Sequence, residues 1–227
     1  MAAKVGATPW TYSKIAAFET CAKQYYHEKV LKQFPYQETV HTKYGNEYHK
    51  AAECYIRDGT PLPAKFSFSL DALDTLNAMP GVKLCEYKFG LTADLEPCDF
   101  WDKDVWWRGT VDLLIINAKT EKATVIDYKT GKSAQYADTD QIELMAMATF
   151  KNFPKVKQVR GGLLFVVAGK LIKGNYHVDN EPALWAKWLG KFKRLEAAHK
   201  NDVWNPSPSG LCRKHCPVTE CVHNGNN

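Results

Sequence analysis

Two short apolar runs, each interrupted by one Asp, constrain the fold of this 227-residue chain more than any other feature. Residues 109–117 read GTVDLLIIN and residues 123–131 read ATVIDYKTG, with a polar connection at 118–122 between them. β-Branched residues dominate both runs, and turn formers separate them. The pattern therefore predicts two adjacent β-strands, joined as a hairpin.

Charged side chains occupy unusual positions within these runs. Asp127 and Lys129 are two positions apart, so both side chains point to the same face of an extended strand. We expect Asp112 to approach them from the neighbouring strand. Two carboxylates and an ammonium at one end of an apolar sheet are costly unless something occupies the site. The natural occupant is a hard divalent cation such as Mg²⁺, which prefers oxygen ligands.

The remaining elements alternate in a way that is typical of a mixed α/β fold. Apolar periodicity and turn residues predict them, and Ser13 is the expected cap of the first helix. The strand at 160–168 is very apolar and is expected in the interior of the sheet, paired with the next strand across Gly169. The predicted helices cover 13–32, 41–57, 70–77, 138–150 and 181–200, and the predicted strands cover 83–92, 105–117, 123–129, 160–168 and 171–178.

Composition and charge exclude some classes of protein and favour others. No window is apolar enough for a membrane span, and the first residues lack the apolar core of a secretory signal, so a cytoplasmic protein is expected. The net charge is +5, and residues 151–200 hold eleven Lys or Arg against three acids. Such a basic flank suits a polyanionic partner, although a solvated surface has the same composition. No phosphate-binding loop or dinucleotide fingerprint occurs.

Seven cysteines are an odd number, which argues against a disulfide framework. Their spacing is more informative than their count. Three of them, Cys54, Cys85 and Cys98, are scattered among apolar residues and are expected to be buried thiols. Three others crowd a C-terminal stretch as C-x₃-C-x₄-C at 212–221, where they offer three thiolates to a metal centre that commonly takes four soft ligands.

Four short motifs occur in order along the chain. They are Gly45-x-x-x-His49, Gly109-x-x-Asp112, Asp127-Tyr128-Lys129-Thr130-Gly131 and Gln141. Taken together they resemble the PD-(D/E)XK nuclease superfamily, and within it the RecB-like branch that includes the AddB type and the iron–sulfur nucleases of CRISPR adaptation. The fourth motif departs from the Gln-x-x-x-Tyr pattern of that branch, because Met145 stands at the tyrosine position.

The resemblance implies a restriction-endonuclease-like αβββαβ core and a metal-dependent nuclease using Mg²⁺ or Mn²⁺, with a second ion left open. Lys129 would orient or deprotonate the attacking water, or stabilise negative charge in the transition state. Gln141 would position that lysine or a phosphate, and Glu86 could reach the site as an outer ligand or through water. The alternative for Asp127 and Lys129 is an ordinary salt-bridged strand end. The implied metal ligands are the side chains of His49, Asp112 and Asp127 and the carbonyl of Tyr128.

The same resemblance gives the cysteines a role. In the iron–sulfur nucleases of this branch, a cysteine ahead of the histidine helix joins three C-terminal ones. This implies a structural [4Fe–4S] cluster on Cys21, Cys212, Cys216 and Cys221, clipping the two ends of the chain together. One alternative is Zn²⁺, with His215 or His223 replacing a thiol. The other is that the cysteines bind no metal.

The expected protein is a single domain over 1–227, with an N-terminal helical segment (1–60), a nuclease core (61–200) and a cysteine-rich tail (201–227) packed on the N-terminal helix.

The protein is expected to be a DNA exonuclease acting on single-stranded or free ends in recombination, repair or replication. A phage origin, and hence the host cytoplasm, is compatible with its length. Any helicase or recombination protein would be a separate partner. The alternative is a non-catalytic DNA-binding or assembly protein. Four aromatic residues either stack on bases or pack in the interior: Trp101, Trp106, Trp107 and Tyr136.

Overall fold

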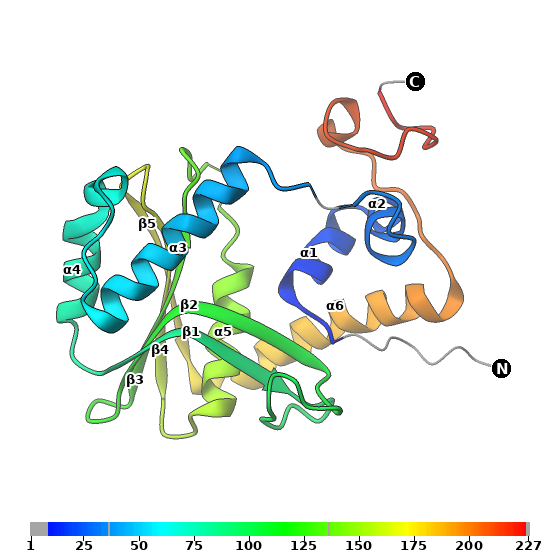
Figure 1. The fold of residues 1–227 in the computed structure, drawn as a ribbon. Helices are drawn as coiled ribbons and strands as arrows, with labels where there is room; N and C mark the ends of the chain where they lie inside the picture. Colours follow the sequence, from blue (N-terminus) through cyan, green and yellow to red (C-terminus); the bar gives the residue numbers. More distant parts are fainter. Residues whose placement is uncertain (1–8, 36, 136, 226–227) are drawn as a thin grey trace. The chain divides into compact units, whose positions relative to one another are not determined.

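The computed structural model describes residues 9–35, 37–135 and 137–225 (Figure 1). The chain divides into two compact units. The central unit comprises Glu38–Trp185, and the terminal unit combines both ends of the chain, Met1–Gln37 and Ala186–Asn227. That the two units act as one domain stays a prediction.

A five-stranded mixed sheet forms the middle of the central unit, in the order β1-β2-β3-β4-β5. Strands β3 and β4 are parallel and connect through helix α5 (Asp140–Asn152), whereas the other neighbours are antiparallel. The predicted hairpin is confirmed as β2 and β3, and β4 is interior and pairs with β5 as predicted. The strands are β1 (Val82–Leu91), β2 (Trp107–Asn117), β3 (Lys122–Lys129), β4 (Gln158–Phe165) and β5 (Lys170–His177).

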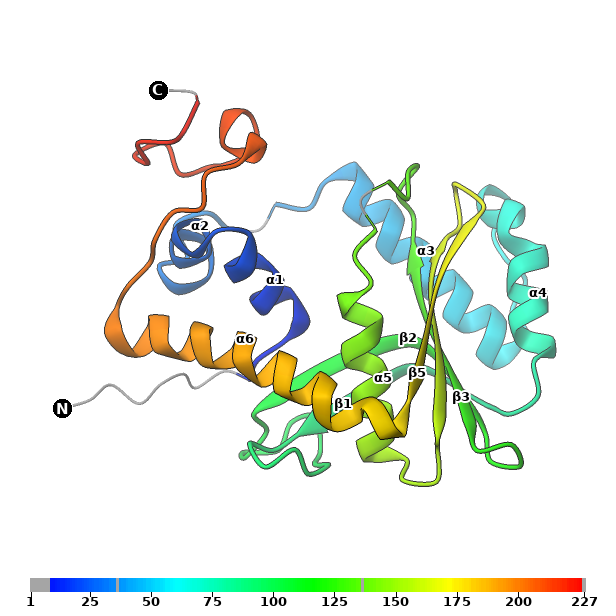
Figure 2. The same ribbon diagram turned by 180° about the vertical axis from the view of Figure 1, so that it is seen from behind.

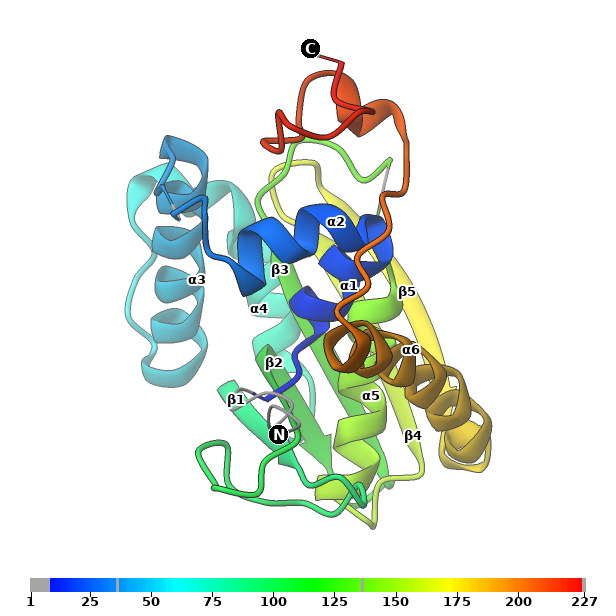
Figure 3. The same cartoon turned by 90° about the vertical axis from the view of Figure 1, so that its right-hand side faces the viewer.

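Helices cover both faces of this sheet (Figures 2 and 3). Helices α3 (Val40–Asp58) and α4 (Leu70–Ala78) lie on one face and α5 on the other. Every residue of α5 from 144 to 150 is buried, as expected for a crossover helix under a sheet. The apolar core between α3, α4 and the sheet contains Tyr48, Ala52, Ile56, Phe66, Leu73, Leu76, Leu113, Ile115, Ile126, Tyr128 and Val166.

The single helix predicted over 13–32 is wrong, because the chain is extended at Cys21 (φ −164°, ψ 111°). Helix α1 (Tyr12–Thr20) ends there, and α2 (Ala22–Tyr25) continues into a π-helical turn. Thr11, and not Ser13, caps α1, with its hydroxyl accepting a hydrogen bond from Lys14 N at 3.3 Å. The apolar stripe runs across the break, so periodicity alone does not reveal it.

The terminal unit is held together by aromatic rings. Trp204, which follows helix α6 (Glu181–Asn201), stacks on Tyr26 with ring centroids 5.0 Å apart and on Tyr25 at 5.9 Å. Tyr25 Oη also lies 3.1 Å from His199 Nε2. These contacts fasten the segment after α6 to the N-terminal helices. No helix within the described ranges is long and apolar enough to cross a membrane.

Replacing Gly90 in β1 with Ala is expected to destabilise the protein by about 2–3 kcal/mol. A Cβ at Gly90 would lie 2.6 Å from Cys98 O and 2.8 Å from Asp99 O, and these backbone atoms can move only if the loop after β1 shifts. Urea unfolding measures the change. Gly190→Ala on α6 is the matched control, because a Cβ there meets nothing within 4 Å and should stabilise the helix by about 0.5–1 kcal/mol. Equal effects at both positions would contradict the prediction.

Candidate metal centre and cysteine pocket

Neighbouring strands β1 and β2 bring two carboxylates together. Cys85 pairs with Leu113 and Tyr87 with Val111, so Glu86 stands directly opposite Asp112, and the ladder is interrupted at this point. Glu86 has a φ of +50°, in the left-handed region that residues other than glycine rarely adopt. Strained backbone of this kind concentrates at functional sites. The conformation therefore marks Glu86 as a candidate functional residue.

Helix α3 adds an imidazole to this pair. His49 Nδ1 lies 3.1 Å from Asp112 Oδ1, and one ligand atom each of His49, Glu86 and Asp112 lie within 4.8 Å of one another. In the part of the chain that the structure describes, no other group of three His, Cys, Asp or Glu side chains is this close. One turn earlier, a Cβ at Gly45 would lie 3.4 Å from Thr130 Oγ1, so this glycine allows α3 to approach the end of β3.

Strand β3 supplies a second, hydrogen-bonded group. Tyr128 N donates to Asp112 Oδ2 at 2.6 Å, which ties β3 to the first carboxylate. Gln141 Nε2 on α5 donates to Asp127 Oδ1 at 2.6 Å, while Lys129 Nζ donates to Gln141 Oε1 at 2.9 Å. Lys129 Nζ also lies 2.7 Å from Asp127 Oδ2. Asp127, Lys129 and Gln141 thus form a closed ring of polar contacts.

The electrostatics of the site favour a bound proton or cation. Burial and the charge of Asp112 raise the pKa of Asp127 to about 6, against the opposing effect of Lys129. Burial and Asp112 also raise the pKa of Glu86. Burial lowers the pKa of His49, but its hydrogen bond to Asp112 and the surrounding carboxylates outweigh burial, so this pKa is raised. A divalent cation among these groups would relieve the same repulsion.

These pKa shifts predict that metal affinity depends on pH. Below pH 6 the affinity for Mn²⁺ is expected to fall by about a hundredfold per pH unit, because both Asp127, with a pKa of about 6, and His49, with a raised pKa, must lose a proton to bind the ion. The affinity should level off only above the raised pKa of His49. Titration of metal-free protein with Mn²⁺ between pH 5 and 8 measures this, with proton release as a second readout. An affinity that is the same across this range would contradict the prediction.

The predicted site residues fall into two neighbouring groups. The first contains His49, Asp112 and Glu86, although the sequence predicted Glu86 only as an outer ligand or as a residue acting through water. Asp127 lies outside that group of three and contacts Lys129 and Gln141, although the charge of Asp112 acts on its pKa. The N–H of Tyr128 orients Asp112, and a ligand role for the Tyr128 carbonyl stays a prediction.

Met145 takes the place of a tyrosine in the motif that begins at Gln141. It is buried, and a Cβ at Gly109 would lie 2.6 Å from Met145 Cε. The glycine of the second motif therefore makes room for the methionine, and the two fasten α5 to β2. Met145 packs in the interior and is not a surface contact for a substrate.

The aromatic residues considered for base stacking differ in their exposure to solvent. Trp107 is fully buried and Trp106 is half-buried, so Trp107 belongs to the interior. Trp101 is 72% exposed. Tyr136 lies outside the described residues.

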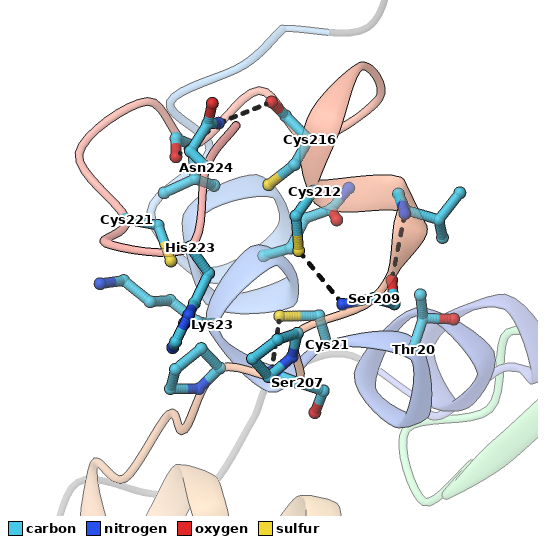
Figure 4. Close-up of a pocket in the computed structure, with 15 residues that line it drawn as sticks. Thr20, Cys21, Lys23, Ser207, Ser209, Cys212, Cys216, Cys221, His223 and Asn224 are labelled. Carbon is cyan, nitrogen blue, oxygen red and sulfur yellow. Dashed lines mark hydrogen bonds between the residues drawn. The ribbon is translucent and has the colours of Figure 1, made fainter. Parts of the chain in front are cut away.

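Four cysteines from the two ends of the chain line one pocket in the terminal unit (Figure 4). They are Cys21, from the break between α1 and α2, and Cys212, Cys216 and Cys221 from the C-terminal stretch. Figure 4 shows their sulfur atoms directed toward the same space. His223 also lines this pocket, and His215 does not. Cys54, Cys85 and Cys98 lie in the central unit, where they are half-buried and not fully buried as predicted.

A proline-rich loop at 205–210 supports two of these sulfurs. Ser207 N donates to Cys21 Sγ and Ser209 N donates to Cys212 Sγ, each at 3.4 Å (Figure 4). Pro206 and Pro208 alternate with these serines and have no N–H, so the donors of this loop are spaced to reach two different sulfurs. This role was not predicted from the sequence, although the alternating Pro-Ser pattern at 206–209 is a signal for it.

Among the described residues, no three cysteine sulfurs come within 4.8 Å of one another. Tetrahedral zinc with bonds of about 2.3 Å holds its sulfurs about 3.8 Å apart, so binding of one zinc ion by three of these thiols requires their side chains to move closer together.

Comparisons with known proteins identify related folds. A family model described as "PD-(D/E)XK nuclease superfamily" matches residues 69–221. No curated protein matches the chain. A solved structure described as "Putative exonuclease" from Eubacterium rectale aligns with a TM-score of 0.54 and 11% identity, covering 94% of this chain and 89% of that chain. Another, described as SSO0001, aligns with a TM-score of 0.44 and 11% identity, covering 98% and 89%. At this identity, the first likeness supports the fold alone.

Proposed function

Because this chain belongs to the PD-(D/E)XK nuclease superfamily, we propose that it is a metal-dependent nuclease that hydrolyses DNA with single-stranded character or free ends. The fold is the mixed α+β arrangement of restriction-endonuclease-like proteins. The observation that supports the proposal most strongly is the convergence of His49, Glu86 and Asp112 beside Asp127 and Lys129.

The donor set fits a hard divalent cation. Three of its four side chains are carboxylates, whose oxygens Mg²⁺ and Mn²⁺ prefer, and the fourth is an imidazole. Asp127 Oδ2 is buried and accepts no hydrogen bond of good geometry, although Lys129 Nζ is 2.7 Å away, so this oxygen retains capacity for a ligand. We assign His49, Glu86, Asp112 and Asp127 as the residues that would hold the ion. When bound, the ion would acidify a water molecule and offset charge on the phosphate.

The residues of the chain have separate tasks in this proposal. Lys129, held by Gln141 Oε1, points its ammonium at the space beside Asp127, where it can orient the attacking water or stabilise charge developing on the phosphate. Gln141 is a positioning residue, because it bonds to both Lys129 and Asp127. Tyr128 N keeps the Asp112 carboxylate in a fixed orientation.

We propose that the cysteine pocket holds a [4Fe–4S] cluster on Cys21, Cys212, Cys216 and Cys221, because these four residues line one pocket. The amides of Ser207 and Ser209 are directed at two of the sulfurs, as the outer hydrogen bonds to cluster ligands are. Zn²⁺ is the alternative, and His223 is the histidine of this pocket that would replace a thiol. Anaerobic purification separates the two. A brown protein containing iron supports the cluster, and a colourless protein with one zinc per chain overturns it.

Digestion of end-labelled single-stranded and double-stranded DNA with Mn²⁺ tests the nuclease assignment, with a chelator as the control. Loss of the end label as mononucleotides or short oligonucleotides indicates an exonuclease, and internal cuts indicate an endonuclease. A role in recombination, repair or replication, with any helicase as a separate protein, belongs to the same proposal. Binding without cleavage by protein that holds Mn²⁺ would instead favour a non-catalytic DNA-binding protein.

A further inference from the structure

The loop between β1 and β2, residues 92–106, is fixed onto the end of β1 (Figure 1). Cys98 N donates to Gly90 O at 3.1 Å and Trp106 N donates to Leu91 O at 2.8 Å. Leu91 also forms an isolated antiparallel bridge with Pro97. Because these contacts are between backbone atoms, the loop presents its side chains from a defined position.

Two aromatic rings and two cations gather on this loop and the adjoining strands. Arg108 Cζ lies 4.5 Å from the ring centroid of Trp101 and 4.8 Å from that of Phe100. Lys88 Nζ lies 5.9 Å and 5.5 Å from the same centroids. Trp101 is nevertheless 72% exposed. We call Lys88, Phe100, Trp101 and Arg108 the hairpin platform. Exposing so large a ring to water is unfavourable, and a ligand that covers the ring recovers this free energy.

The hairpin platform and the metal centre lie on the same two strands. Lys88 follows Glu86 by two residues, and Arg108 precedes Asp112 by four. At about 3.3 Å per residue, the platform cations are about 7–13 Å along the strands from these carboxylates. A strand of nucleic acid spans this distance with a few nucleotides.

The charge of the loop selects what can occupy the platform. Its acids repel a phosphate backbone, so a duplex laid along the loop is disfavoured. An unpaired base carries no charge and can stack on the open face of Trp101, with its phosphate beside Lys88 or Arg108. The acidic residues of the loop are Asp94, Glu96, Asp99, Asp102 and Asp104, against the single basic residue Lys103.

We propose that the hairpin platform is a subsite for an unpaired nucleobase, which stacks on Trp101 and holds one DNA strand beside the metal centre. The inference rests on the proposed nuclease function and adds to it the residues that hold the unpaired strand.

Binding of two labelled strands of equal length tests this subsite, one an oligothymidylate and the other an abasic deoxyribose-phosphate strand. In an Asp127→Asn background, to prevent cleavage, Trp101→Ala is expected to weaken oligothymidylate binding about tenfold and to leave abasic-strand binding unchanged. Trp101→Phe should retain most of the affinity. In the otherwise wild-type enzyme, Trp101→Ala should raise KM and leave kcat unchanged. Val82→Ala, at the opposite and exposed end of β1, is the control and should change neither.

The outcomes separate this inference from the nuclease assignment. If the wild type cleaves DNA, but adding Trp101→Ala to the Asp127→Asn protein does not weaken oligothymidylate binding, the proposed subsite is wrong. The nuclease assignment is then unaffected. An equal loss on both strands would also overturn the inference, because it would indicate a backbone contact. If the wild type fails to cleave, the nuclease assignment falls, while a base-dependent loss on Trp101→Ala still supports the subsite.

Discussion

The Asp127→Asn variant is expected to lose metal-dependent DNA cleavage by about a thousandfold or more, and yet to be more stable than the wild type at neutral pH. The loss of activity follows because Asn keeps the shape of Asp but removes a charge that would hold the cation beside Lys129. The oxygen that accepts from Gln141 Nε2 at 2.6 Å is retained. The variant should therefore fold and still bind DNA.

The gain in stability follows from the raised pKa of Asp127. Its pKa is about 6 in the folded protein against 3.8 in an unfolded chain, so the folded state holds a proton between these values that the unfolded state has released. The wild type consequently loses stability as the pH rises from about 4 to about 6. Asn is neutral throughout, so the gain is absent near pH 4 and is about 1–2 kcal/mol above pH 6 in metal-free protein.

Denaturant unfolding at several pH values, with cleavage assays beside it, measures both effects. Asp179→Asn is the control, because that carboxylate is 82% exposed and should affect neither activity nor stability. If the variant cleaves DNA at the wild-type rate, Asp127 does not hold the catalytic metal ion. A variant that is less stable at pH 7 would show that the ion pair with Lys129 outweighs the burial of the carboxylate.

The second large effect is expected from Cys221→Ser. Cys221 is the most deeply buried of the four pocket cysteines, and its loss should release the bound metal and destabilise the terminal unit by about 3–5 kcal/mol. The size of the effect reflects the loop that the ligands close, since Cys21 and Cys212 are 191 positions apart and the cost of closing a loop grows with its length.

Metal content, visible absorbance and limited proteolysis measure this prediction. New cleavage sites should appear in 9–35 and 186–225, while the central unit stays resistant. Cys54→Ser is the control, because Cys54 lies on α3 and not in the pocket. An unchanged metal content and proteolysis pattern in Cys221→Ser would contradict a metal at these cysteines.

The sequence predicted the parts of this protein that depend on repeated local patterns. Apolar runs rich in β-branched residues are sufficient to locate β2 and β3, and the two-residue spacing of Asp127 and Lys129 is sufficient to bring their side chains together, at 2.7 Å. The position of Gln141 follows from its place in the first turn of the next helix. Each of these predictions depends only on the geometry of one strand or of one turn of helix.

What the sequence did not reveal depends on single residues in unusual conformations. The extended backbone at Cys21 divides a helix whose apolar stripe continues, and the positive φ of Glu86 occurs at a residue that is not glycine. Neither conformation follows from a repeated local pattern of residue types. Likewise, an acidic turn between strands gave no sign that Trp101 would be held over Arg108, because that contact depends on how the loop folds back on β1.

The composition of the terminal unit has a consequence for biosynthesis. Residues 9–35 of this unit leave the ribosome long before residues 186–225, which complete it. The nascent protein must therefore carry an unfinished, aromatic-rich N-terminal segment through most of translation, while the sheet of the central unit is already able to form. The proposed metal site of Cys21, Cys212, Cys216 and Cys221 can therefore be completed only after its C-terminal ligands have been synthesised.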